Sequence, residues 1–182
     1  MKTTQKIVQA AMIAAVYVVL TLLANAFGLA NYAIQVRFSE ALTILPFFTP
    51  AAVPGLFIGC ILSNILTGCL PFDIVFGSLA TLLGALGTYT LGRMSHAACG
   101  NAGLATSKPS RKGILYRLLA PLPPIIANTL IVPYVLAYVY RFEGSIPYFM
   151  LTVGIGEVIS CGILGLPLLF TLEKYKKFMF PG

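Results

Sequence analysis

Long apolar segments separated by clusters of basic residues are the feature that most constrains this chain. Hydrophobic residues make up 58% of its 182 residues and charged residues only 9%, whereas a soluble domain carries about 25% charged residues. Ten of the twelve Lys and Arg side chains lie within 2–6, 93–117 and 174–177, at the ends of the apolar segments. A chain of this composition is expected to be an integral membrane protein.

Six hydrophobic segments divide the chain, at about 7–27, 36–49, 52–67, 72–92, 112–140 and 146–170. A membrane-spanning helix needs about 20 mainly apolar residues, so the segment 36–49 is expected to form a short helix shielded by its neighbours. We predict an all-α bundle of six transmembrane helices in one membrane domain, 1–182, with a loop at 93–111. The prolines at 121–124 either begin a new helix or kink a longer one.

The basic residues also predict the orientation. With the N-terminus inside, both termini and the loop 93–111 are cytoplasmic, and only Arg37 and Arg141 of the Lys and Arg residues lie outside. Basic residues favour the cytoplasmic side of a membrane, so we reject the inverted topology. A signal peptide cleaved after Ala26 is an alternative for the start, but the long apolar run favours a span.

Small residues recur at the spacing that lets membrane helices pack closely. Gly55 and Gly59 form a GxxxG motif, for which internal packing is the favoured interpretation. Two alanine pairs lie on the first segment, Ala10 with Ala14 and Ala11 with Ala15. Their face is open to two interpretations, because a peripheral helix can pack internally or dock a partner subunit.

Glu157 is the clearest candidate for ligand contact. It lies deep in the sixth segment, among small residues in GIGEVIS at 154–160. An ionisable group at membrane depth is costly and is usually functional. An internal ion pair is the alternative, but few cations are available to form one.

For each of the other polar residues, both ligand contact and a structural role are possible interpretations. Asp73 suits a helix N-terminus as well as a ligand. Arg37 and Glu40, three residues apart, either pair with each other or bind. Asn64 and Asn128 either bond between helices or contact substrate.

The candidate polar residues gather in the outer half of the predicted bundle. A mixture of acidic, amide, basic and phenol side chains suits a planar, polar, aromatic small molecule captured from outside. Catalytic, ATP-binding and redox motifs are absent from the sequence, so we predict neither an enzyme nor a resident metal or cofactor. The predicted substrate-binding residues are Tyr32, Arg37, Glu40, Asn64, Asp73, Asn128 and Glu157.

Three stretches of the chain resemble the QueT family of membrane proteins. They are VRFSEALTILPFFTPAAVPGLFIGCILSN at 36–64, PFDIVFGSLATLLGALGTY at 71–89 and GIGEVISCGILGLPLL at 154–169. With PPIIANTLIVP at 123–133, the resemblance covers most of the chain outside 94–113.

The resemblance implies the substrate-binding S-component of an energy-coupling-factor (ECF) transporter in a bacterial plasma membrane. Such a subunit is not an enzyme; it works with a transmembrane coupling subunit and two ATPases. The face of Ala10, Ala11, Ala14 and Ala15 is similar to the surface that docks the coupling subunit. The alternatives are an S-component for another vitamin, a stand-alone secondary transporter that uses Glu157 as a proton site, and a small membrane enzyme.

The substrate implied by the resemblance is a 7-deazaguanine precursor of queuosine: the aminomethyl or cyano precursor, or queuine. A guanine-like edge presents two adjacent donors, which one carboxylate accepts together. Glu157 or Asp73 is expected to accept them, and Asn64 or Asn128 to donate to the ligand carbonyl. A cationic aminomethyl group favours a second carboxylate, Glu40.

Overall fold

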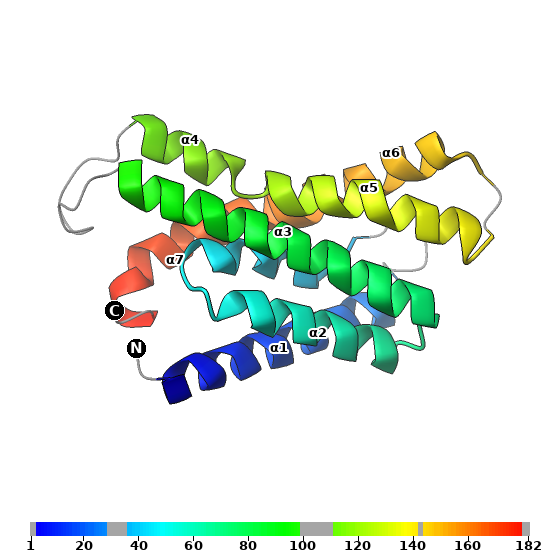
Figure 1. Cartoon of the computed structure of the whole chain (residues 1–182), viewed down its shortest axis with the longest axis horizontal. Helices are drawn as coiled ribbons and strands as arrows, with labels where there is room; N and C mark the ends of the chain where they lie inside the picture. Colours follow the sequence, from blue (N-terminus) through cyan, green and yellow to red (C-terminus); the bar gives the residue numbers. More distant parts are fainter. Residues whose placement is uncertain (1–2, 29–35, 99–110, 142–143, 180–182) are drawn as a thin grey trace.

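The computed structural model describes residues 3–28, 36–98, 111–141 and 144–179, and these are helical throughout apart from short connections (Figure 1). No strand occurs in these ranges. The elements are α1 (Thr3–Ala26), the 3₁₀ helix η1 (Phe38–Phe47), α2 (Ala52–Leu66), α3 (Pro71–Ala98), α4 (Arg111–Leu119), α5 (Leu122–Tyr138), α6 (Ile146–Glu157), the π-helical segment η2 (Val158–Leu164) and α7 (Gly165–Met179).

Four helical stretches are long and apolar enough to cross a membrane: Thr3–Ala26, Pro71–Ala97, Lys112–Tyr138 and Ile146–Tyr175. The prediction of an all-α membrane protein is therefore confirmed. η1 and α2 are shorter apolar helices. The 15 residues of α2 extend about 22 Å, less than the hydrocarbon thickness of about 30 Å. The count of six spanning helices stays a prediction.

The three basic segments come together at one end of the bundle. α1 begins there, α3 ends there, α4 begins there and α7 ends there (Figure 1). We expect this arrangement if both termini and the connection between α3 and α4 lie on the same side of the membrane. Which side is cytoplasmic stays a prediction from the charge distribution.

α1 and α2 pack closely because glycines line the contact. A Cβ on Gly55 would lie 2.7 Å from the carbonyl oxygen of Ala10, and one on Gly59 would lie 3.1 Å from the Cα of Ala14. Internal packing of the GxxxG motif therefore matches its favoured interpretation. Ala10 and Ala14 face α2, while Ala11 and Ala15 are exposed. The alanine face is thus split between an internal contact and an open surface.

The proline cluster begins a new helix. α4 ends at Leu119, and Pro123 and Pro124 lie in the first turn of α5, where a missing N–H costs no hydrogen bond. The carbonyl of Ala120, left without a helical partner at this break, accepts a 3.0 Å hydrogen bond from the Thr88 hydroxyl. α3 crosses α5 closely there, because a Cβ on Gly84 would lie 2.6 Å from the Cα of Pro124.

The predicted end of the fourth hydrophobic segment differs from the structure. α3 continues to Ala98, although Gly92 and Arg93 were expected to end it, so the loop predicted at 93–111 begins later. Gly92 does not break the helix; it lies against the backbone of Phe47, where a side chain would not fit. Residues 99–110 of that loop lie outside the described residues.

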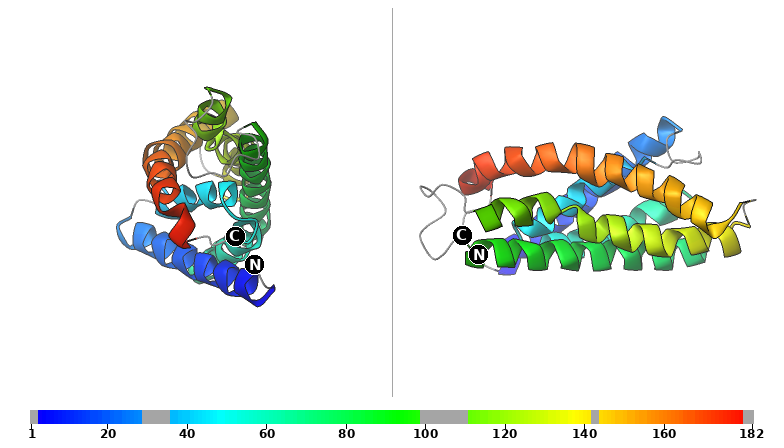
Figure 2. Two further views of the ribbon diagram at one scale, coloured as in Figure 1. Left: turned by 90° about the vertical axis from the view of Figure 1, so that its left-hand side faces the viewer. Right: turned by 90° about the horizontal axis from the view of Figure 1, so that it is seen from above.

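η1 lies inside the bundle, surrounded by longer helices when the molecule is viewed from the end at which the chain begins and ends (Figure 2). Every residue from Ser39 to Phe47 is buried. A 3₁₀ helix of 10 residues is unusual, since such runs rarely exceed three or four residues. This short inner helix places Glu40 in the interior, where neighbouring helices can surround its side chain.

Candidate functional site

Glu40 is the centre of a buried polar cluster. Its side chain is 1% exposed. The Tyr17 hydroxyl donates to its Oε1 at 2.6 Å, and the Asn128 amide donates to its Oε2 at 3.5 Å. Both carboxylate oxygens therefore have donors from other helices, α1 and α5. Buried charged groups are tolerated when they are hydrogen-bonded in this way.

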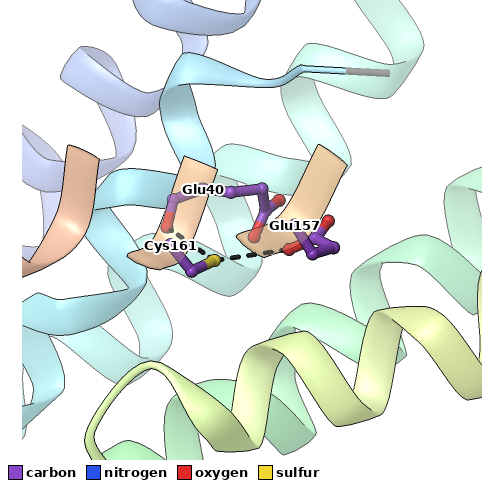
Figure 3. A group of neighbouring side chains, drawn as sticks. All are labelled: Glu40, Glu157 and Cys161. Carbon is purple, nitrogen blue, oxygen red and sulfur yellow. Dashed lines mark hydrogen bonds between the residues drawn. The ribbon is translucent and has the colours of Figure 1, made fainter. Parts of the chain in front are cut away.

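The side chain of Glu157 lies beside that of Glu40 (Figure 3). Glu157 ends α6 directly before the π-helical segment η2, and π turns occur frequently at functional sites. The Cys161 thiol lies 3.3 Å from Glu157 Oε2 and 3.4 Å from the main-chain carbonyl oxygen of Glu40. The Thr43 hydroxyl donates to that same carbonyl oxygen at 2.6 Å. η1 and η2 thus hold the two carboxylates next to each other.

Asn64 of α2 and Asp73 of α3 border Gly77 of α3. A Cβ on Gly77 would lie 3.3 Å from the Asn64 amide nitrogen and 3.6 Å from Asp73 Oδ1. The Asn64 amide also lies 3.6 Å from the Cys60 sulfur, and the Thr81 hydroxyl donates to that sulfur at 3.4 Å. Polar atoms of α2 and α3 therefore face each other across a position that has no side chain.

Asp73 is also part of a contact between α3 and the end of α5. The Tyr140 hydroxyl donates to Asp73 Oδ2 at 3.0 Å and accepts a 3.3 Å hydrogen bond from the Leu70 amide. Burial and the nearby Asp73 carboxylate raise the pKa of Tyr140 to about 12. The phenol therefore stays protonated and able to donate at neutral pH. This contact favours the structural interpretation of Asp73 over direct ligand contact.

Arg37 and Tyr32 complete the predicted set. The Arg37 amide donates to the Ser160 hydroxyl at 3.2 Å, and its carbonyl accepts from the Glu40 amide at 3.1 Å. Within the described ranges, the ion pair that forms is Arg117 with Glu173, so the side-chain pair of Arg37 and Glu40, one of the two alternatives for these residues, is not made. Tyr32 lies outside the described residues.

Sequence reasoning missed Tyr17 and Cys161. Tyr17 stands in the middle of an apolar run, where its hydroxyl is as informative as an acidic group, because a phenol in hydrocarbon needs a partner. Cys161 follows Glu157 by one helical turn, and this spacing was the feature of the sequence that could have indicated its contact with Glu157. Both side chains are almost wholly buried, and both contact a candidate carboxylate.

Glu40, Glu157 and Cys161 also form a set of metal-type donors. One ligand atom from each lies within 4.8 Å of the others. Two carboxylates and a thiol are a mixed hard and soft set. Phenol and amide donors point at Glu40, and such donors stabilise the carboxylate without a metal. The arrangement is therefore better suited to an organic ligand that offers hydrogen-bond donors.

A family model described as the QueT transporter matches residues 7–174. The chain belongs to this family. A curated relative, the queuosine precursor transporter QueT of Lactococcus lactis subsp. cremoris (strain MG1363), is 36% identical over 80 residues. These residues cover 44% of this chain and 47% of the relative, so the match spans about half the length of that relative. No solved structure matches the chain. Membership in a transporter family agrees with the prediction that the protein is not an enzyme.

Proposed function

We propose that this protein is the substrate-binding S-component of an ECF transporter and that it captures a 7-deazaguanine precursor of queuosine. Its family and the name of its relative support a transport role for a queuosine precursor. One structural observation carries the site: Glu40 and Glu157 are buried side by side, with the Asn128 amide next to them. The ligand is bound from outside the cell for uptake.

The chemistry of the cluster matches the edge of a 7-deazaguanine. Glu157 accepts the ring N–H and the exocyclic amine together, which is a charge-assisted and geometrically selective contact. The Asn128 amide donates to the ligand carbonyl. Glu40 Oε2 accepts from a cationic aminomethyl group, and Asn64 and Asp73 border the same region. Arg37 and Tyr32 stay candidates for ligand contact.

The energy for uptake comes from partner proteins. The transmembrane coupling subunit docks on the exposed Ala11 and Ala15 of α1, and two ATPase subunits hydrolyse ATP. The protein lies in a bacterial plasma membrane with both termini and the connection between α3 and α4 cytoplasmic. Expression with and without these partners tests this part, because a stand-alone secondary transporter would take up ligand without the ATPases.

Calorimetric titration of the purified chain in detergent tests ligand capture. The panel is the aminomethyl precursor, the cyano precursor, queuine and guanine. Tight and selective binding of one 7-deazaguanine supports the proposal, while no binding to any of them by folded protein rejects the substrate. Glu157→Gln should weaken binding at least tenfold, about 1.4 kcal/mol. The matched control is Glu173→Gln, which changes an acid paired with Arg117 outside the cluster and should keep the affinity.

A further inference from the structure

α1 is tied to the inner helix η1 by two side-chain hydrogen bonds one turn apart. The Tyr17 hydroxyl donates to Glu40 Oε1 at 2.6 Å, and the Thr21 hydroxyl donates to Ser39 Oγ at 2.8 Å. All four residues are buried. Tyr17 and Thr21 lie on one face of α1 because they are four residues apart. Two consecutive residues of η1 are therefore held by α1, and one of them is a proposed ligand-binding carboxylate.

The packing around Tyr17 fixes the direction of its hydroxyl. A Cβ on Gly59 would lie 2.9 Å from the Tyr17 Cβ, so the base of the Tyr17 side chain packs against Gly59 of α2. Its side chain is 1% exposed, and a phenol at this depth has no water to bond. Its acceptor is a carboxylate, and bonds from a hydroxyl to a carboxylate are short and strong. Tyr17 is thus a rigid donor aimed at one oxygen of Glu40.

A carboxylate whose Oε1 is occupied can offer mainly its other oxygen. Among the described residues, the hydrogen bond recorded for Glu40 Oε2 is a long one of 3.5 Å from the Asn128 amide. We propose that Tyr17 is a positioning residue for ligand selectivity: its hydroxyl holds the Glu40 carboxylate so that Oε2 faces the amine of a cationic ligand. This inference rests on the proposed function, because it assumes that a 7-deazaguanine lies beside Glu40.

The test compares two ligands that differ by one ammonium group, 7-aminomethyl-7-deazaguanine and 7-methyl-7-deazaguanine. Their dissociation constants are measured by calorimetry for the wild type and for Tyr17→Phe, which removes only the hydroxyl. The wild type should bind the amine ligand at least tenfold more tightly than the methyl ligand. In Tyr17→Phe this preference should fall below threefold, while affinity for the methyl ligand changes less than threefold.

Thr21→Val is the matched control. It removes the neighbouring buried hydrogen bond, which contacts Ser39 and not Glu40, and should keep the preference for the amine. Glu40→Gln should abolish the preference, and adding Tyr17→Phe to it should cause no further change, because both substitutions act on one interaction. Glu40→Asp withdraws the carboxylate from Tyr17 while keeping its charge, and should also reduce the preference if Tyr17→Phe does not fold.

The outcomes separate this inference from the proposed function. Folded wild-type protein that binds neither these two ligands nor the cyano precursor or queuine rejects the proposed function, whereas binding of only the cyano precursor or queuine overturns this inference alone. Wild-type protein that prefers the amine, with the same preference in Tyr17→Phe, overturns the positioning role and leaves the proposed function intact. An equal loss of affinity for both ligands in Tyr17→Phe also overturns it, because that result indicates packing alone. Equal wild-type affinity for both ligands removes Glu40 from contact with the amine and overturns the inference.

Discussion

Replacing Gly59 with Ala should both destabilise the protein and weaken ligand binding. The new Cβ would lie 2.9 Å from the Cβ of Tyr17 and 3.1 Å from the Cα and carbonyl oxygen of Ala14. Carbon atoms in comfortable contact are about 3.5–4.0 Å apart, so α1 must move away from α2 by roughly half an ångström or more. Overpacking of this kind costs about 1–3 kcal/mol. The shift also lengthens the hydrogen bond from Tyr17 to Glu40.

Reversible unfolding in mixed micelles, followed by circular dichroism, measures the change in the free energy of unfolding. The control is Gly154→Ala, because its Cβ would meet the Thr129 side chain at an ordinary distance of 3.5 Å. Both variants gain about 0.5–1 kcal/mol of helix preference over glycine, so their difference isolates the steric effect. A Gly59→Ala protein as stable as Gly154→Ala would refute the reasoning about the α1–α2 contact.

The α4–α5 break and the Asp73 contact each offer a further test. Thr88→Val should lower the free energy of unfolding by about 1–3 kcal/mol, because the buried Ala120 carbonyl loses its donor; denaturation of the purified variant measures it. Tyr140 should contribute stability that is complete below pH 10 and lost as the pH rises toward 12, because burial and Asp73 raise its pKa from 10.0 to about 12 and the unfolded state ionises first. Unfolding at a series of pH values, compared with Tyr140→Phe, measures this contribution.

Each of these tests has an outcome that contradicts it. Thr90→Val is the control for Thr88, because the exposed Thr90 hydroxyl bonds to the carbonyl of Gly87 in its own helix. Equal stability of the two variants would contradict the role of Thr88. For Tyr140, the quantity to compare is the alkaline loss of stability in the wild type and in Tyr140→Phe. An alkaline loss of the same size in both proteins would contradict the assigned pKa.

The class of the protein was predictable from the sequence because few of its residues are charged. Apolar length and basic clusters indicated a helical membrane protein, and the cost of a buried charge singled out Glu157. Glu40 and Asn128 were also candidates, and the structure brings all three together. Their role in ligand binding stays a prediction. The pattern of apolar residues along each helix could not reveal that these three side chains lie close together. Their closeness depends on how η1 is enclosed by the other helices.

Other features depend on tertiary contacts that a local pattern does not contain. Gly92 was expected to end a helix, but it provides the room in which the Phe47 backbone packs. Neither the 3₁₀ form of η1 nor the π form of η2 has a local sequence signal. Tyr17 was overlooked because tyrosines near apolar segments are usually interfacial. Its acceptor, Glu40, is 23 residues away in the sequence.

The π-helical turn after Glu157 sets the rotational register of the end of the chain. Each α-helical residue turns the chain by about 100°, and a wider turn accommodates an additional residue without breaking the helix. Deleting one residue from 158–164 would therefore restore an ordinary helix and leave the orientation of α7 relative to α6 nearly unchanged. The inward-facing Leu169 and Leu172 would stay inward, and only the wide turn that follows Glu157 would be lost. A relative one residue shorter here would need its inward leucines one position earlier in the sequence.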